Sequence, residues 1–196
     1  MRKILYILLL CVCMQPVAAQ HIAHGKELLR KHKNKAACRY RNKYSAKQRR
    51  QFYPYNITDT VKLVSFRYHK NNYPVQGNSL VIDSLIESKS LTDEDITKLT
   101  DIFFNSFYKT RPDYGSLKQC FFPRNAILFF NNQGMLKSYI LICFHCSRYE
   151  RSSDEIYMGD NCTEKMEMLR QFFISKGVEF GAGMNNVIYP GEVSDE

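Results

Sequence analysis

Alternation of apolar and polar residues from 61 to 68 has the two-residue period of a strand with one buried face. The stretch 79–86 predicts a second strand. Thr92 then precedes three consecutive acidic residues, which is typical of a capped helix start. We expect that helix to end near Ser106. Its predicted buried stripe consists of Ile96, Leu99, Ile102 and Phe103.

Two apolar runs within 120–146 flank the sequence Asn131-Asn132-Gln133-Gly134, which suits a type I turn followed by a left-handed glycine. This predicts a long β-hairpin. If Asn131 faces Met135, the numbers of paired residues add up to 266, and Cys120 lies opposite Cys146. In that register the predicted core face consists of Cys120, Phe122, Ala126, Leu128 and Phe130 together with Leu136, Ile140, Ile142, Phe144 and Cys146.

Beyond the hairpin, residues 147–160 are polar and predict a surface loop. Asn161 or Thr163 can cap a last helix that ends at Gly177, a residue suited to a left-handed stop. The inward residues of this helix are predicted to be Met166, Leu169, Phe172 and Phe173. Together these elements predict an α+β fold: a mainly antiparallel sheet with a long β-hairpin, helices packed on it, and a basic helical arm in front.

The first nineteen residues have the features of a secretory signal peptide. Arg2 and Lys3 precede an apolar run of eleven residues, and Val17-Ala18-Ala19 is a small-residue cleavage site. A membrane-spanning helix needs about 20 apolar residues, so we expect no transmembrane segment in the mature chain. We therefore expect a secreted or periplasmic protein, cleaved near Ala19. The remaining ranges are an arm at 20–55, a single α+β domain at 56–183 and an acidic flexible tail at 184–196.

The positive charge is concentrated in the arm. The chain has a formal net charge of +9, but residues 21–50 contain eleven Lys and Arg against Glu27 alone. Apolar and aromatic residues at near-helical spacing predict a basic amphipathic helix from Lys26 to Gln51. Such a helix can contact anionic lipid or glycan, although charge runs are also common on solvated faces of packed helices. The basic residues concerned are Arg30, Lys31, Lys33, Lys35, Arg39, Arg41, Lys43, Lys47, Arg49 and Arg50.

Five cysteines follow the signal segment, and an oxidising compartment favours disulfides among them. The hairpin register pairs Cys120 with Cys146. Cys143 points to the opposite face, so its expected partner is Cys162 at the start of the last helix. Cys38 is then left over. A register slip of one residue would exchange Cys143 and Cys146 in this scheme.

Two other interpretations of the cysteines remain open. Cys120, Cys143, Cys146 and Cys162 have the ligand number of a structural zinc site, but the usual second closely spaced pair is missing. Alternatively, the Cys143-x-x-Cys146 pair can act as a thiol-redox site. Redox pairs of this spacing normally begin a helix, whereas this one ends a strand, which disfavours the redox interpretation.

Arg124 is predicted on the apolar face of the hairpin, where a guanidinium needs a partner. One interpretation is an anion-binding site formed by Arg124, Asn125 and His145. The other is a structural ion pair with one of the later carboxylates, for which the candidates are Asp154, Glu155 and Glu164.

The cysteine pattern also resembles a family. The sequence Cys120-x-Phe122-Pro123-Arg124-Asn125, the motif Ile142-Cys143-Phe144-x-Cys146 and the later Cys162 are similar to those of a group of uncharacterised secreted or envelope proteins of Bacteroidetes-type bacteria. The resemblance covers roughly residues 61–183, without the arm. It implies a periplasmic or exported setting and supplies no activity.

No catalytic motif is recognisable in the sequence, and none of its residues is assigned a catalytic role. We therefore expect a non-catalytic binding or interaction module rather than an enzyme, without a cofactor. The expected partner is anionic lipid or glycan of the cell envelope, or another envelope protein; export disfavours nucleic acid. The alternative is a thiol-redox or zinc-binding protein that uses Cys143-x-x-Cys146.

Overall fold

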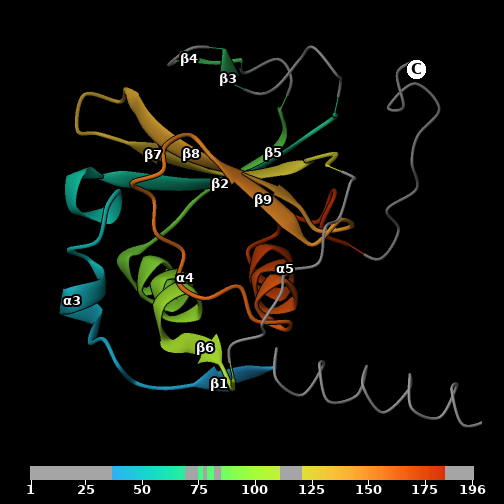
Figure 1. Ribbon diagram of the computed structural model, residues 1–196. Helices are drawn as coiled ribbons and strands as arrows, with labels where there is room; N and C mark the ends of the chain where they lie inside the picture. The colour runs from blue at the N-terminus through green and yellow to red at the C-terminus, as the bar shows by residue number, and fades with distance from the viewer. Residues whose placement is uncertain (1–36, 69–74, 77–78, 82–84, 111–120, 184–196) are drawn as a thin grey trace, which may run out of the picture.

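An antiparallel sheet of five strands forms the centre of the computed structural model, which describes residues 37–68, 75–76, 79–81, 85–110 and 121–183 (Figure 1). Every neighbouring pair of strands runs antiparallel. The predicted α+β fold with a mainly antiparallel sheet is therefore confirmed. In sheet order the strands are β5 (Leu85–Ser90), β2 (Thr60–Phe66), β7 (Asn125–Phe130), β8 (Leu136–Cys143) and β9 (Arg148–Arg151).

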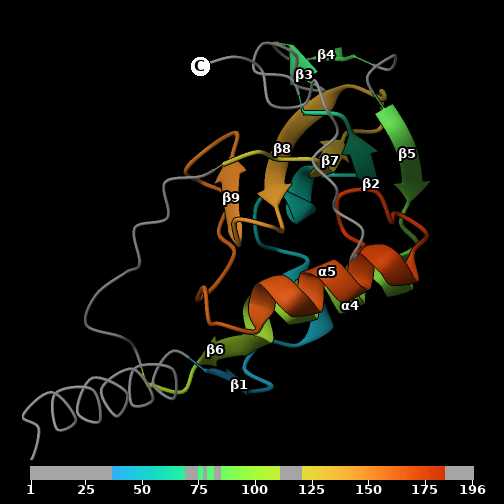
Figure 2. The ribbon, with the colours of Figure 1, turned by 90° about the vertical axis from the view of Figure 1, so that its right-hand side faces the viewer.

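Two helices, α4 (Asp93–Asn105) and α5 (Lys165–Ser175), cover one face of this sheet. Figure 2 shows the same layers after a quarter turn, with β3 and β4 on the other side of the sheet. The elements outside the sheet and the two helices are β1 (Cys38–Tyr40), α3 (Ala46–Arg49), a 3-10 turn (Tyr55–Ile57), β3 (Val75–Gln76), β4 (Ser79–Leu80) and β6 (Ser106–Tyr108). β1 and β6 form a two-stranded ribbon beyond the helices.

Both faces of the central strands are buried, as the unbroken burial of β7 shows. The larger core lies between the sheet and the helices and includes Leu63, Phe129, Ile140, Leu99 and Phe173. A smaller core on the other face contains Val64, Phe66, Val75, Ala126, Leu128, Phe130, Leu136 and Leu141. The sheet is thus the middle layer of the molecule.

Helix α4 agrees closely with its prediction. The hydroxyl of Thr92 accepts the Asp95 N–H, and the Asp95 carboxylate accepts the Thr92 N–H, each at 3.2 Å. This reciprocal capping box satisfies two donors at the helix start. Of the predicted stripe, Ile102 is only partly buried. The helix ends at Asn105 and the chain continues directly into β6.

The hairpin turn is confirmed, but the predicted register is wrong along the strands. The Asn131 N–H donates to Met135 O at 3.0 Å, and Gly134 has the expected positive φ of 73°. A bulge between Phe129 and Phe130 then shifts the pairing by one residue, so that Ile127 rather than Ala126 faces Ile140. A one-residue slip moves side chains to the opposite face. The helix-facing core therefore takes its β7 residues from Ile127 and Phe129, while Ala126, Leu128 and Phe130 face the other core and Phe122 is exposed.

The region after the hairpin also differs in part. The predicted surface loop 147–160 contains the edge strand β9, which pairs on one side only. Edge strands often carry polar and charged residues, so the polar sequence did not indicate a strand there. The N-cap of helix α5 is Glu164, one residue after the predicted candidate Thr163, and it has no side-chain cap. Its predicted inward residues are all buried, and Gly177 has the left-handed conformation that ends the helix.

The predicted continuous helix from Lys26 to Gln51 is wrong over its described part. Residues 38–40 are a strand and only 46–49 are helical. The strand pairs with β6 and the short helix packs on α4, so tertiary contacts override the local helical pattern. The signal segment, the arm up to residue 36, Cys120 and the acidic tail lie outside the described residues.

Candidate functional site

The described part of the arm is fastened to the helical layer at β1. A disulfide joins Cys38 to Cys162, just before α5. The Cys38 N–H also donates to the Glu164 carboxylate at 2.6 Å. In the ribbon, Arg39 lies opposite Phe107. The start of the described chain is therefore tied to two elements that are distant in sequence.

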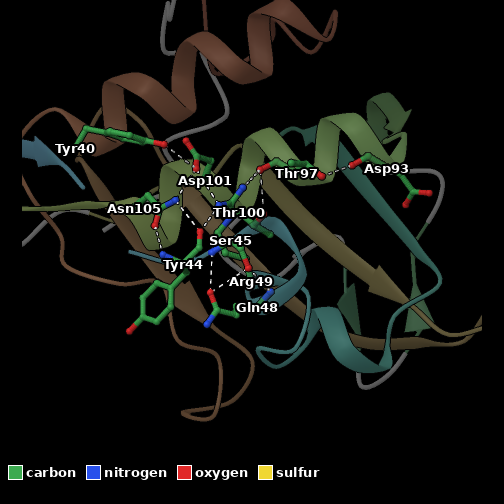
Figure 3. A network of polar contacts seen from close by, with 10 residues as sticks. All are labelled: Tyr40, Tyr44, Ser45, Gln48, Arg49, Asp93, Thr97, Thr100, Asp101 and Asn105. Carbon is green, nitrogen blue, oxygen red and sulfur yellow. Dashed lines mark hydrogen bonds and ion pairs between the residues drawn. The ribbon is translucent and has the colours of Figure 1, made fainter. Parts of the chain in front are cut away.

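A second attachment is the side chain of Arg49, which is only 5% exposed. Figure 3 shows its guanidinium directed at α4, where it forms an ion pair with Asp101 at 3.1 Å. It also donates to Tyr44 O at 2.6 Å and, at 3.3 Å each, to Thr100 Oγ1 and Thr97 O. These partners compensate the burial of a charge. Arg49 is thus a structural residue, not part of a ligand surface.

Asn105, which is fully buried, holds the loop between β1 and α3 (Figure 3). Its side-chain oxygen accepts the Tyr44 N–H at 3.0 Å, and its amide group donates to Tyr44 O at 3.1 Å and to Asp101 at 2.7 Å. Its backbone oxygen accepts the Arg41 N–H at 2.8 Å. The backbone on both sides of Lys43 is therefore positioned by one residue of α4.

Four exposed cations remain along this positioned segment, Arg39, Arg41, Lys43 and Lys47, and we call them the basic strip. Within the part of the chain that the structure describes, none of the four forms an ion pair, whereas Arg50 pairs with Asp93. The other basic residues predicted for the arm, Arg30, Lys31, Lys33 and Lys35, lie outside the described residues. Among the basic residues of the arm that the structure describes, Arg49 and Arg50 are therefore paired within the fold and the other four are exposed.

Aromatic side chains surround the middle of the basic strip. The Lys43 ammonium lies 4.8 Å from the ring centroid of Tyr44 and 5.4 Å from that of Phe107. Tyr157, 49% exposed, stacks on the buried Phe104 with ring centroids 6.0 Å apart. These rings come from three stretches of the chain, at 44, 104–107 and 157, so no sequence pattern could have shown that they lie near one another.

Lys43 and the groups around it also influence one another electrostatically. The hydroxyl of Tyr44 raises the pKa of Lys43, and Tyr157 and Asp160 act in the same direction. Partial burial raises the pKa of Tyr157, with Asp160 and Tyr44 adding to the effect. Asp160 also accepts the Tyr108 N–H at 3.1 Å. Lys43, Tyr44, Phe107, Tyr157 and Asp160 together are called the Lys43 site below.

The cysteines are connected differently from the prediction. Cys162 does form a disulfide, but with Cys38, which was expected to be left over. The predicted Cys143–Cys162 bridge is therefore wrong, because the strand formed by the arm brings Cys38 to α5. The predicted bridge between Cys120 and Cys146 involves a residue outside the described part of the chain.

One contact still supports the interpretation of Cys143 and Cys146 as a chemical site. The Cys146 N–H donates to Cys143 Sγ at 3.2 Å, and both residues are buried. Buried thiols react slowly because a partner cannot reach them. The bridge to Cys38 removes Cys162 from the four-cysteine zinc set. Among the described residues, no group of three or more His, Cys, Asp or Glu is arranged to hold a metal ion.

The proposed anion-binding residues do not share one environment. Asn125 is fully buried and donates to Phe180 O at 2.9 Å, Arg124 is partly buried, and His145 is exposed in the turn after β8. Gly181, with φ of 75°, packs so closely that an added Cβ would lie 2.5 Å from Asn125 Oδ1. Asn125 thus anchors the chain after α5, which is a structural role.

An open groove of about 540 Å³ lies between α4 and α5. It is lined by Arg49, Thr97, Lys98, Asp101, Ile102, Met168, Gln171, Phe172 and Ser175. Arg49 and Asp101 form an ion pair with each other there, and Ile102, Met168 and Phe172 supply the apolar part of the lining.

No described helix has the length and apolar character needed to cross a membrane. Comparison with known proteins found no matching family model, no similar curated protein and no similar solved structure. The function must therefore be argued from the residues of this chain.

Proposed function

We propose that the protein is a non-catalytic binding module of a secreted or periplasmic setting that contacts anionic groups of the cell envelope through its basic strip. The observation that carries this proposal is the contrast between the arm's cations. Arg49 is buried and paired with Asp101, whereas Arg39, Arg41, Lys43 and Lys47 are exposed without an ion pair among the described residues. Exposed, uncompensated cations attract phosphate and carboxylate groups.

The backbone attachments support a binding role over a merely solvated surface. Positioning a ligand-contacting segment in advance lowers the entropy that binding would otherwise lose. Here the disulfide at Cys38, the ribbon with β6 and the contacts of Asn105 hold the strip on the helical layer. The resemblance to envelope proteins and the signal-like first nineteen residues are the support for an exported setting.

The test is co-sedimentation of the oxidised protein with vesicles that contain 30% phosphatidylglycerol, compared with vesicles of phosphatidylcholine alone. The variant Arg39→Gln, Arg41→Gln, Lys47→Gln should bind the anionic vesicles roughly 100-fold more weakly, at about 1 kcal/mol for each charge near the surface. Its control is Lys89→Gln, Lys98→Gln, Lys137→Gln, which removes the same charge from exposed sites elsewhere. Equal losses in the two triple variants would show that net charge alone matters and would remove the strip from the proposal.

A second candidate function is thiol chemistry at Cys143, favoured by the hydrogen bond that its sulfur accepts from the Cys146 N–H. Donors directed at sulfur stabilise a thiolate, which is the reactive form. Native alkylation with iodoacetamide, followed by mass spectrometry, tests this second candidate. Rapid labelling of Cys143 before unfolding would favour thiol chemistry, whereas labelling only after unfolding would match its burial.

A further inference from the structure

The Lys43 site combines features that a uniform anion-binding surface does not need. It contains one cation fixed beside two aromatic rings and an acceptor, Asp160, within electrostatic reach of that cation. A surface that only attracts phosphates has no use for aromatic ring faces, because a phosphate offers them no apolar surface. The mixture of cation, ring faces and carboxylate is therefore informative about ligand chemistry.

Each component matches one part of an acidic sugar. The C–H-rich face of a pyranose ring packs well on aromatic rings, whose faces carry partial negative charge. A carboxylate can accept sugar hydroxyls, and a lysine ammonium can pair with the acid group of the ring. Tyr157 presents half of its surface to solvent while Phe104 supports it from behind.

The geometry points to an acidic glycan, a polymer of sugar rings that carry carboxylates, as the ligand of the Lys43 site. This inference rests on the proposed function, because it names the class of anion that the basic strip binds. The neighbouring Arg39, which lies opposite Phe107 in the ribbon, would meet the acid group of an adjacent sugar. Single-stranded nucleic acid also combines rings with charge, and it is the competing ligand that the experiment tests.

The experiment measures binding of the full oxidised protein to oligogalacturonate by isothermal calorimetry at about 150 mM salt. A neutral malto-oligosaccharide of the same length, polyphosphate and oligo-dT are the comparison probes. We expect oligogalacturonate to bind at least 10-fold more tightly than the neutral sugar. Tyr157→Leu should weaken that binding roughly 3- to 10-fold, the usual effect of losing one aromatic contact.

Two further variants serve as controls. Tyr157→Phe keeps the ring and should bind nearly as well as the unaltered protein. Tyr139→Leu removes a half-buried tyrosine that packs against the smaller core on the other face of the sheet, and it should leave binding unchanged. Lys43→Met, which keeps a stem of similar length, should lose at least as much affinity as Tyr157→Leu.

The outcomes separate this inference from the proposed function. If oligogalacturonate and polyphosphate bind equally and Tyr157→Leu changes neither, anion binding stands and the sugar assignment is overturned. Tighter binding of oligo-dT, lost in Tyr157→Leu, would assign the site to nucleic acid and also overturn it. If no anionic probe binds, this inference is overturned, and the proposed function then stands only if the protein still binds the anionic vesicles.

Discussion

Lys165 provides a quantitative test of the packing between α4 and the segment before α5. The residue is 2% exposed, and its ammonium donates to Phe103 O at 2.8 Å and to Met158 O at 3.0 Å. Burial lowers the pKa of Lys165 from its ordinary 10.5 to about 8, against a smaller opposite effect of Asp160. Two carbonyl acceptors do not replace the hydration of the charge.

The sign of the pH dependence follows from proton binding in the two states. Below pH 8 both the folded and the unfolded protein hold the proton, and the cost of burying the charge is fully present. Between pH 8 and 10.5 the unfolded state binds more protons, so the free energy of unfolding rises with pH. Lowering a pKa from 10.5 to about 8 corresponds to a gain of about 3 kcal/mol across this window.

The assay is urea unfolding of the unaltered protein and of Lys165→Met at several pH values between 7.5 and 10.5. The other titrating groups are common to both proteins, so the difference between the two free energies of unfolding reports Lys165 alone. We expect the unaltered protein to gain up to about 3 kcal/mol relative to Lys165→Met over this range. A parallel series with Lys89→Met, at an exposed lysine of β5, should show no such trend. A difference for Lys165→Met that stays constant or falls with rising pH would refute the reasoning.

Three other predictions concern the attachments of the fold, each measured by urea unfolding under non-reducing conditions. Replacing both cysteines of the Cys38–Cys162 bridge by serine should cost about 2–4 kcal/mol, because the bridge closes a loop of 124 residues. Asp101→Asn should cost about 1–3 kcal/mol, since it removes the counter-charge of the buried arginine of α3, and an unchanged midpoint would contradict that pairing. Gly181→Ala should cost about 1–3 kcal/mol more than Gly177→Ala. Both glycines have positive φ, but only the first would bring a Cβ against neighbouring side chains, so equal losses would argue against the close packing.

Local signals in the sequence were sufficient wherever an element depends on its own residues. Thr92 and the acids after it start α4 because a capping box needs only residues three apart. Likewise, Gly134 makes the hairpin turn because its positive φ is a local property. The buried stripes of α4 and α5 followed from helical period for the same reason.

The predictions failed for elements whose conformation depends on residues that are distant in the sequence. The bulge beside Phe130 changes the register of the hairpin. The sequence could not reveal this change, because both faces of β7 are buried and no polar residues mark one face as the outer one. Residues 38–40 became a strand because β6 offers a free edge for pairing. Their helical propensity is worth too little to oppose such tertiary contacts.

By itself, the sequence determined the α+β class, the main helices, the hairpin turn and the concentration of positive charge in the first part of the chain. The tertiary structure decided which cysteine forms a disulfide with Cys162, which basic residues are buried in ion pairs and which aromatic rings lie around Lys43. The physical reason is that caps, turns and periodicity act between neighbours along the chain. Disulfides, buried ion pairs and binding sites form between segments that only the folded backbone brings together.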